Sequence, residues 1–123
     1  MPNRAIVAIV DDDVTMRDAT QDLLEAAGYS TATFSSAAGF LDSSLRGGVS
    51  CLVTDMRMQG MTGLELYQEL AASGKVVPTV LVTAYLDDSV RSRARKAGIV
   101  CCLSKPFAPE ELIECVRSVL ART

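Results

Sequence analysis

The chain has no histidine and no tryptophan, and aromatic side chains make up only 5% of its 123 residues. The absence of histidine excludes a histidine general base, a Ser-His-Asp or Cys-His catalytic site, a histidine metal ligand and a phosphohistidine carrier. Long apolar runs are also missing, because none approaches the roughly 18 residues that a membrane-spanning helix needs. Any chemistry must therefore rely on carboxylates, hydroxyls, lysine, arginine or thiols.

Charge and cysteine content narrow the class of protein further. The net charge is −3, whereas a nucleic-acid-binding surface needs a basic stripe. The N-terminus does not resemble a secretory signal, and the four cysteines lie within apolar runs, where free cysteine behaves as a small hydrophobic residue. We therefore expect one cytoplasmic domain with reduced cysteines, no membrane segment and no nucleic-acid-binding surface.

Five short apolar runs alternate with segments of helical periodicity. The predicted strands are residues 5–10, 31–34, 51–54, 79–82 and 100–103. Apolar residues at helical spacing indicate helices around residues 16–27, 37–45, 66–71, 90–97 and 112–120. Three of the strands are nearly unbroken runs of Val, Ile, Leu and Cys, which is typical of strands buried on both faces of a parallel sheet. The pattern predicts an α/β fold with helices on both faces of that sheet.

Side chains with functional chemistry follow four of the predicted strands. Asp11 and Asp12 come after the first strand, Asp55 after the third, Thr83 after the fourth and Lys105 after the fifth. Because ligands of such sheets bind outside the carboxyl ends of the strands, we expect these groups to meet at one edge. Mg²⁺ would keep the close carboxylates ionised, while a lysine and a hydroxyl hold a phosphoryl group that an aspartate can accept. The peptide bond between Lys105 and Pro106 is a candidate cis bond, because cis peptide bonds occur almost only before proline.

These residues lie in motifs that are highly specific when taken together. As they stand here, the motifs are Ile9-Val10-Asp11-Asp12, Val53-Thr54-Asp55-Met56-Arg57-Met58, Gly63, Val82-Thr83-Ala84, Ala97-Gly98 and Lys105-Pro106-Phe107. The chain resembles a response-regulator receiver domain of two-component signalling over essentially its whole length. The residues around Asp55 are most similar to receivers of the nitrogen-fixation and nitrate-regulator type, which commonly precede a helix-turn-helix domain.

The resemblance implies a single receiver domain over residues 1–123, with a flavodoxin-like fold. Its doubly wound, five-stranded parallel sheet would have the strand order 2-1-3-4-5. Asp55 would accept a phosphoryl group from the phosphohistidine of a sensor histidine kinase, which supplies the histidine that this chain lacks. Asp11 and Asp12 would hold Mg²⁺ together with Asp55, and the backbone carbonyl of Arg57 would complete the protein's ligands.

The resemblance also implies a switch. Lys105 would pair with the acceptor carboxylate and later with a phosphoryl oxygen. Thr83 would move to hydrogen-bond the phosphoryl group and carry the signal to the face formed by the fourth helix, the fifth strand and the fifth helix, which could form a phosphorylation-dependent homodimer. Such a domain catalyses its own phosphorylation and dephosphorylation without being a dedicated enzyme, and it would control transcription through an output domain outside this chain.

Two positions depart from the family pattern. Cys102 stands where the family usually has a Tyr or Phe that moves with the threonine, which predicts weakened coupling. Gln59 replaces the usual proline, which predicts a looser loop. Arg57 and Tyr85 are both large and occupy positions that tune the attack of water on the phosphoaspartate. We therefore expect slow self-dephosphorylation, with Tyr85 covering the mouth of the site.

The fourth helix is rich in cations and has little to bury. The cations are Arg91, Arg93, Arg95 and Lys96, and the last helix carries Glu110, Glu111 and Glu114. This pattern predicts a solvated, weakly anchored helix, or a dimer surface in which the cations meet the glutamates. The adjacent Cys101 and Cys102 invite a redox or metal interpretation, which the lack of CxxC spacing and of histidine disfavours.

Other functions fit parts of the sequence. Asp11 and Asp13 fit the D-x-D-x-T motif of a haloacid-dehalogenase-type phosphatase that uses Mg²⁺, although Asp55 would then have no role and Asp13 is favoured as the N-cap of the first helix. A receiver-like interaction module with impaired switching fits Cys102 and Gln59. A flavin-binding protein would share the fold, but no phosphate-binding Ser/Thr/Gly loop follows the first strand.

Overall fold

The protein is built on one sheet of five parallel strands, seen here in a computed structural model that describes residues 5–99 and 101–121. The strands are β1 (Ile6–Val10), β2 (Ser30–Phe34), β3 (Cys51–Asp55), β4 (Thr79–Thr83) and β5 (Cys101–Ser104). Their spatial order is β2-β1-β3-β4-β5, which confirms the predicted doubly wound α/β fold. Each strand lies within two residues of its predicted range, and position 100 of the last prediction lies outside the described residues.

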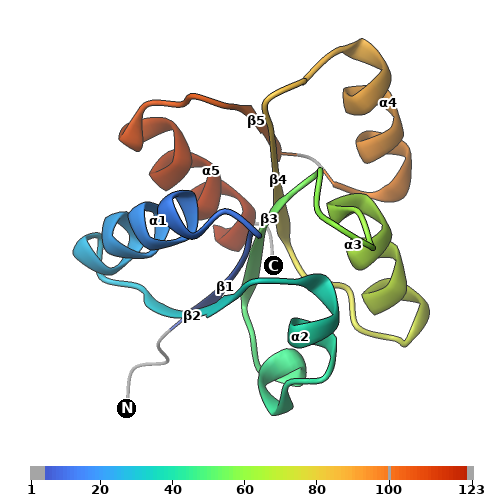
Figure 1. The fold of residues 1–123 in the computed structure, drawn as a ribbon, viewed down its shortest axis with the longest axis horizontal. Helices are drawn as coiled ribbons and strands as arrows, with labels where there is room; N and C mark the ends of the chain where they lie inside the picture. Colours follow the sequence, from blue (N-terminus) through green and yellow to red (C-terminus); the bar gives the residue numbers. More distant parts are fainter. Residues whose placement is uncertain (1–4, 100, 122–123) are drawn as a thin grey trace.

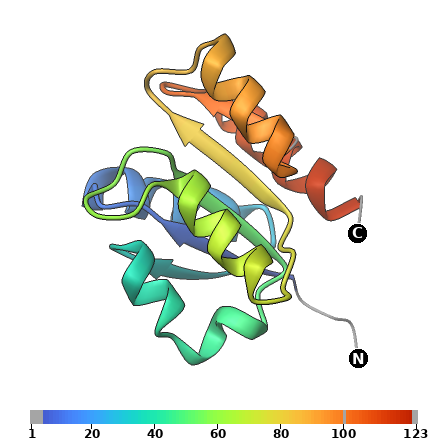
Figure 2. The same cartoon turned by 90° about the vertical axis from the view of Figure 1, so that its right-hand side faces the viewer.

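Helices cover both faces of the sheet. They are α1 (Val14–Ala26), α2 (Ala37–Leu41), α3 (Gly63–Ala72), α4 (Asp88–Ala97) and α5 (Pro109–Ala121). In Figure 1, α1 and α5 lie on one face, and α2, α3 and α4 lie on the other. Figure 2 shows α3 and α4 next to each other on this second face. No helix in the described part of the chain is long and apolar enough to cross a membrane.

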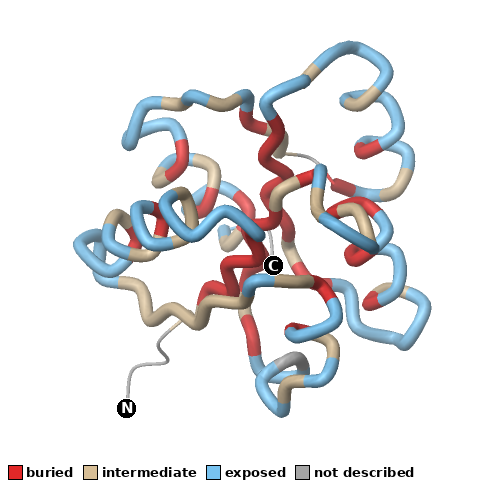
Figure 3. The backbone as a smooth tube through the Cα atoms, viewed as in Figure 1, coloured by how far each residue is buried: buried red, intermediate tan, exposed pale blue. Residues whose placement is uncertain are grey.

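Two hydrophobic cores lie against the opposite faces of β1, because alternate strand residues point in opposite directions. Val7 and Ile9 pack in the core beneath α1 and α5, whereas Ala8 and Val10 pack beneath α2 and α3. The buried residues in Figure 3 are concentrated in the sheet, while the outer sides of the helices are exposed. This burial on both faces holds the carboxyl ends of the strands in fixed positions.

The second helical segment is shorter than its apolar spacing predicts. Helix α2 ends at Leu41, and a separate 3-10 helix, η1 (Ser44–Gly47), follows instead of one continuous helix to residue 45. The Ser43 hydroxyl accepts a hydrogen bond from the Leu45 amide at 3.0 Å and so caps this new turn. Serine side chains compete in this way with helix carbonyls for backbone amides, and the spacing of apolar residues cannot predict the outcome of that competition.

Helices α3 and α4 are defined by their caps as much as by apolar spacing. Thr62 and Glu65 form a capping box, in which each side chain accepts a hydrogen bond from the other residue's backbone amide, so α3 begins three residues before its first predicted apolar position. Asp87 caps α4, in which Ala94 is the buried residue. This shallow burial agrees with the predicted weak anchoring of α4.

Candidate functional site

Three carboxylates meet at the carboxyl edge of the sheet. Asp11 and Asp12 follow β1, and Asp55 is the last residue of β3. One oxygen from each carboxylate lies within 4.8 Å of the oxygens of the other two. Asp11 is buried, Asp55 is half-buried and Asp12 is exposed. Closely spaced oxygen donors of this kind, partly open to water, fit a hard divalent cation such as Mg²⁺.

Lys105 joins two of these carboxylates. Its Nζ lies 3.2 Å from Oδ2 of Asp11 and 3.3 Å from Oδ2 of Asp55. The lysine follows β5, and its backbone amide donates to the Thr83 carbonyl at 2.9 Å. The Lys105–Pro106 peptide bond is cis, as the sequence suggested. The lysine and the two carboxylates are therefore held by three different strands.

The electrostatic balance leaves an excess of negative charge. Burial raises the pKa of the Asp55 carboxyl, and the Asp11 charge adds to that rise, while Lys105 opposes it without reversing it. Burial lowers the pKa of the Lys105 ammonium, but Asp11 and Asp55 more than offset this and raise it above its ordinary value. Lys105 therefore stays charged, and its single positive charge does not balance the carboxylates, so a further cation would be attracted to the site.

The backbone around Asp11 is fixed from several sides. Its amide donates to the Phe34 carbonyl of β2 at 3.1 Å, and its carboxylate Oδ1 accepts from the Asp13 amide at 2.9 Å. The Arg17 guanidinium of α1 donates to the Asp11 carbonyl at 2.7 Å. Asp13 caps α1 by accepting from the amides of the next turn, which confirms its predicted role. The contact of Arg17 was missed, because the sequence gives no signal for a side chain that turns back onto the preceding loop.

Asp55 is held against the start of α3. The Gly63 amide donates to the Met56 carbonyl at 3.0 Å, and the Met56 amide donates to the Val82 carbonyl at 2.8 Å. A Cβ added at Gly63 would overlap the carbonyl oxygen of Asp55 and crowd the Leu81 side chain. The glycine of the predicted motif is thus required by close packing of α3 against the strand end.

Thr83, Tyr85 and Arg57 form the outer border of the site. Thr83 is buried at the end of β4, and its hydroxyl accepts a hydrogen bond from the Tyr85 amide at 3.1 Å. Tyr85 is 66% exposed, and the Arg57 guanidinium carbon lies 4.7 Å from the centre of its ring. The Arg57 amide in turn donates to Oδ1 of Asp55 at 3.4 Å. A hollow of about 520 Å³ is lined by all three residues.

Gln59 contacts the site through its backbone. Its amide donates to Oδ2 of Asp12 at 3.3 Å and so joins the loop after β3 to the loop after β1. The sequence predicts a looser loop because a proline is missing here, but proline has no amide hydrogen and could not make this bond. Local propensity could not reveal the contact, because it depends on residues 47 positions apart.

The neighbouring cysteines of β5 face opposite sides of the sheet. Cys101 packs in the core beneath α5, together with Cys115, whereas Cys102 packs with Val90 and Ala97 of α4. Burial raises the pKa of the Cys101 thiol to about 12 and also raises the pKa of Cys102, which disfavours the reactive thiolate of each. Because the two side chains point apart, they cannot act as a vicinal thiol pair.

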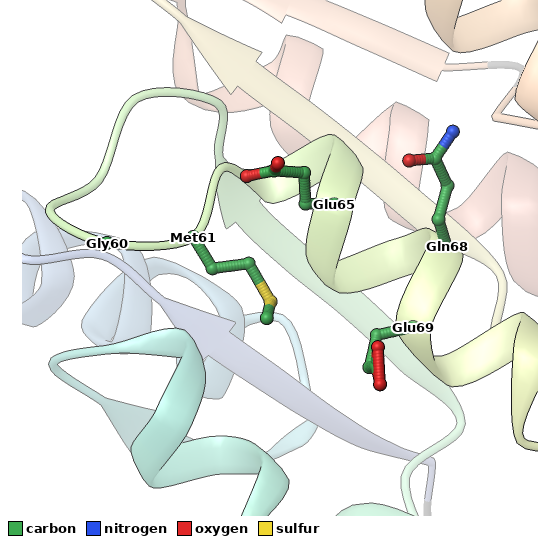
Figure 4. Close-up of a pocket in the computed structure, with 5 residues that line it drawn as sticks. All are labelled: Gly60, Met61, Glu65, Gln68 and Glu69. Atoms are coloured by element: carbon green, nitrogen blue, oxygen red, sulfur yellow. The ribbon is translucent and has the colours of Figure 1, made fainter.

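A second hollow, of about 560 Å³, lies along α3. It is lined by Gly60, Met61, Glu65, Gln68 and Glu69, which Figure 4 shows on the loop before α3 and along one side of that helix. None of these residues belongs to the carboxylate and lysine site. The candidate functional site is therefore the edge of the sheet at the carboxyl ends of β1, β3, β4 and β5.

The sheet order and the carboxylates and lysine at its carboxyl edge place the chain among the flavodoxin-like α/β domains. The chain belongs to the response regulator receiver domain family, whose model matches residues 7–117. It is 37% identical over 119 residues to nodulation protein W of Bradyrhizobium diazoefficiens, covering 97% of this chain and 52% of that protein. It is also 37% identical over 123 residues to the transcriptional regulatory protein FixJ of Azorhizobium caulinodans, covering 100% of this chain and 58% of FixJ.

Solved structures agree with these relatives. FixJ-N superposes with a TM-score of 0.87 at 30% identity, covering 100% of this chain and 98% of that one. The response regulator StyR gives a TM-score of 0.89 at 38% identity, covering 98% of this chain and 61% of that one. The chain spans about half the length of the curated relatives that it matches.

Family membership confirms the predicted resemblance. The chain is a receiver domain of two-component response regulators, a class that is generally not a dedicated enzyme. The family match excludes the haloacid-dehalogenase-type phosphatase, and the capping role of Asp13 removes one of its two motif aspartates from the site. Flavin binding has no support from these relatives.

Proposed function

We propose that Asp55 is the phosphoacceptor of this receiver and takes its phosphoryl group from the phosphohistidine of a sensor histidine kinase. The observation that carries the proposal is the pair of contacts from Lys105 Nζ, at 3.2 Å to Asp11 and 3.3 Å to Asp55, beside a third carboxylate. A carboxylate held by a lysine at a strand end, and half-open to water, suits in-line attack on phosphorus.

Mg²⁺ is the cofactor that we propose for this site. Asp11, Asp12 and Asp55 would hold it through their carboxylates, and Arg57 would do so through its backbone carbonyl. When bound, the cation supplies positive charge to phosphoryl oxygens during transfer. Three carboxylates share the site with one lysine, and burial and the Asp11 charge raise the pKa of the Asp55 carboxyl. A bound cation would offset this excess of negative charge, which supports the proposed role.

The transfer step forms one bond to phosphorus and breaks another. An Asp55 oxygen attacks phosphorus, the P–N bond to the donor imidazole breaks, and its electron pair returns to the imidazole nitrogen. Lys105 keeps its contact with Asp11 and turns its other hydrogen bond from Asp55 to a phosphoryl oxygen. In this sense the domain catalyses its own phosphorylation, and later its own dephosphorylation by water.

Thr83 is the proposed switch residue. To hydrogen-bond the phosphoryl group, its hydroxyl must give up the hydrogen bond from the Tyr85 amide. This movement would shift the loop that leads into α4 and alter the face formed by α4, β5 and α5. Cys102 lies on this face between β5 and α4 and is smaller than an aromatic residue, so a receiver-like interaction module with impaired switching is the second candidate function.

The switched face is also our candidate for a phosphorylation-dependent homodimer. Its opposite charges are Arg91, Arg93, Arg95 and Lys96 on α4, and Glu110, Glu111 and Glu114 on α5. Transcriptional regulators among the relatives suggest that the signal controls transcription through an output domain outside this chain. We expect no direct contact of this domain with nucleic acid or membrane, and the proposal keeps the predicted cytoplasmic location.

Intact-mass measurement after incubation with Mg²⁺ and a small phosphodonor tests the proposal. The wild type should gain one phosphoryl group, and Asp55→Asn should gain none. Phosphorylation of the Asp55→Asn variant, or an unmodified wild type that nonetheless binds Mg²⁺, would overturn the assignment of the acceptor. Backbone NMR with beryllofluoride then separates the two candidate functions, because only a switching receiver shows shifts that extend from Thr83 to β5 and α4.

A further inference from the structure

The three carboxylates of the site are held in two different ways. Lys105 contacts both Asp11 and Asp55. Asp12 is exposed, and its Oδ2 accepts a hydrogen bond from the backbone amide of Gln59 at 3.3 Å. One carboxylate of the proposed cation site, that of Asp12, is therefore held by a backbone amide of the loop that follows Asp55.

The bond leaves Asp12 able to bind a cation. An ionised carboxylate has about four lone-pair positions on its two oxygens, and one amide occupies a single position. The amide donor carries no net charge and therefore does not compete electrostatically with a metal ion. The bond needs only a residue with a backbone N–H, so the exposed Gln59 side chain has no part in it.

We propose that the backbone amide of Gln59 is a positioning group for the metal site, which holds the Asp12 carboxylate toward Asp11 and Asp55. This inference rests on the proposed Mg²⁺ site. An exposed carboxylate without such a partner must lose rotational freedom when a cation binds, and that loss weakens affinity. With the amide in place, part of this ordering is already present in the metal-free protein.

The same bond links cation binding to the outer border of the site. Gln59 lies two residues after Arg57, whose amide contacts Asp55 and whose guanidinium lies over Tyr85. The loop that carries both residues continues into Gly60, which Figure 4 shows at the turn before α3. Ordering of Asp12 by a cation therefore also orders the loop that carries Arg57.

Two matched substitutions test the role of the amide. Gln59→Pro removes the backbone N–H, whereas Gln59→Ala removes the side chain and keeps the N–H. We expect Q59P to bind Mg²⁺ roughly three- to tenfold more weakly than the wild type, as for loss of one exposed hydrogen bond to a charged group. Q59A should remain within about twofold of the wild type on the same scale. Affinities are measured by following backbone amide shifts during Mg²⁺ titration, which needs no phosphorylation.

The outcomes separate this inference from the proposed function. A wild type that binds no Mg²⁺ contradicts the metal site itself. If the wild type binds Mg²⁺ and Q59P binds it equally well, or Q59A weakens it as much as Q59P does, the role of the amide is wrong.

A second measurement does not depend on the proline substitution folding normally. In Asp12→Ala the Gln59 amide has lost its acceptor, so its hydrogen exchange with water should be several-fold faster than in the wild type. The Gly47 amide, which lies in η1, serves as the reference and should not change. Equal exchange rates at Gln59 in the two proteins would overturn the inference even where Q59P is unstable.

Discussion

The guanidinium of Arg57 lies over the ring of Tyr85, with its central carbon 4.7 Å from the ring centroid. Each partner is tied through its backbone amide to a different part of the site, Arg57 to the Asp55 carboxylate and Tyr85 to the Thr83 hydroxyl. The stacked pair thus connects the loops after β3 and β4. In a receiver with Cys102 in place of an aromatic residue, the pair directly links Asp55, the proposed acceptor, to Thr83, the proposed switch residue.

This stacking predicts slow loss of the phosphoryl group. Arg57→Ala and Tyr85→Ala should each shorten the phosphoaspartate lifetime several-fold, because an exposed cation–π contact contributes about 0.5–1 kcal/mol and shields the approach of water. Tyr85→Phe keeps the ring and should behave as the wild type. Decay of the phosphorylated protein is followed by intact mass, and a wild type that decays as fast as both alanine variants contradicts the prediction.

Asp55→Asn should stabilise the metal-free fold at neutral pH by on the order of 1 kcal/mol. The pKa of the Asp55 carboxyl is raised by burial and by Asp11, so its charged form opposes folding. That cost is absent below the ordinary pKa of an aspartate, and it develops as the pH rises through the raised value. The gain in Asp55→Asn should therefore shrink as the pH falls from 7 toward 4.

Chemical unfolding at several pH values in the presence of a chelator measures this difference. Asp18→Asn on the exposed surface of α1 is the control and should change the free energy of unfolding little at any of these pH values. A less stable Asp55→Asn at pH 7 would show that the contact with Lys105 outweighs burial and the repulsion from Asp11.

Gly63→Ala should destabilise the protein by about 1–3 kcal/mol, because its Cβ would overlap the Asp55 carbonyl and force the start of α3 away from β3. The same variant should be phosphorylated more slowly at Asp55, the proposed acceptor, because that residue moves with its backbone. Gly47→Ala is the matched control, because a Cβ at that position meets no atom within 4 Å. Thermal unfolding and phosphorylation rates are compared, and equal loss in both variants argues against the close approach.

Asp13→Ala should cost about 1 kcal/mol through loss of the α1 N-cap. Asp13→Ser keeps a capping oxygen and should recover most of the stability. Neither substitution should abolish phosphorylation at Asp55, because the Asp13 side chain is directed to the amides of α1. Loss of phosphorylation in a folded Asp13→Ser variant would show that this carboxylate has a role beyond the cap.

The sheet is predictable from the sequence because strands that are buried on both faces consist of continuous runs of apolar residues. Val7 to Val10 form such a run, and Asp11 marks its end unambiguously. The clustering of Asp11, Asp55 and Lys105 then followed from topology, since parallel strands present their carboxyl ends at one edge. The positions of the strands and of the residues at their ends depend on the path of the backbone, and the local pattern of apolar residues predicts that path well.

Features that depend on long-range side-chain geometry were not predictable. Apolar spacing said nothing of the Arg17 contact with Asp11 or of the stacking of Arg57 on Tyr85. At Gln59 the missing proline predicts a looser loop, but it gives no sign that the folded chain supplies the Gln59 amide with an acceptor in Asp12. The contacts of Arg57 and Gln59 form only after distant segments have docked, and the contact of Arg17 depends on how its side chain turns back onto the preceding loop, so apolar spacing encodes none of them.

The contact between Lys105 and Asp11 spans 94 positions and joins the first strand unit to the last. During synthesis the chain therefore presents Asp55, the proposed acceptor, well before Lys105, the cation that contacts it. A partly synthesised or truncated chain carries the aspartate without the lysine and without β5 to hold it in place. If Asp55 is the acceptor, as we propose, phosphorylation requires the finished fold, because Lys105 and the strand that positions it are the last parts of the site to be made.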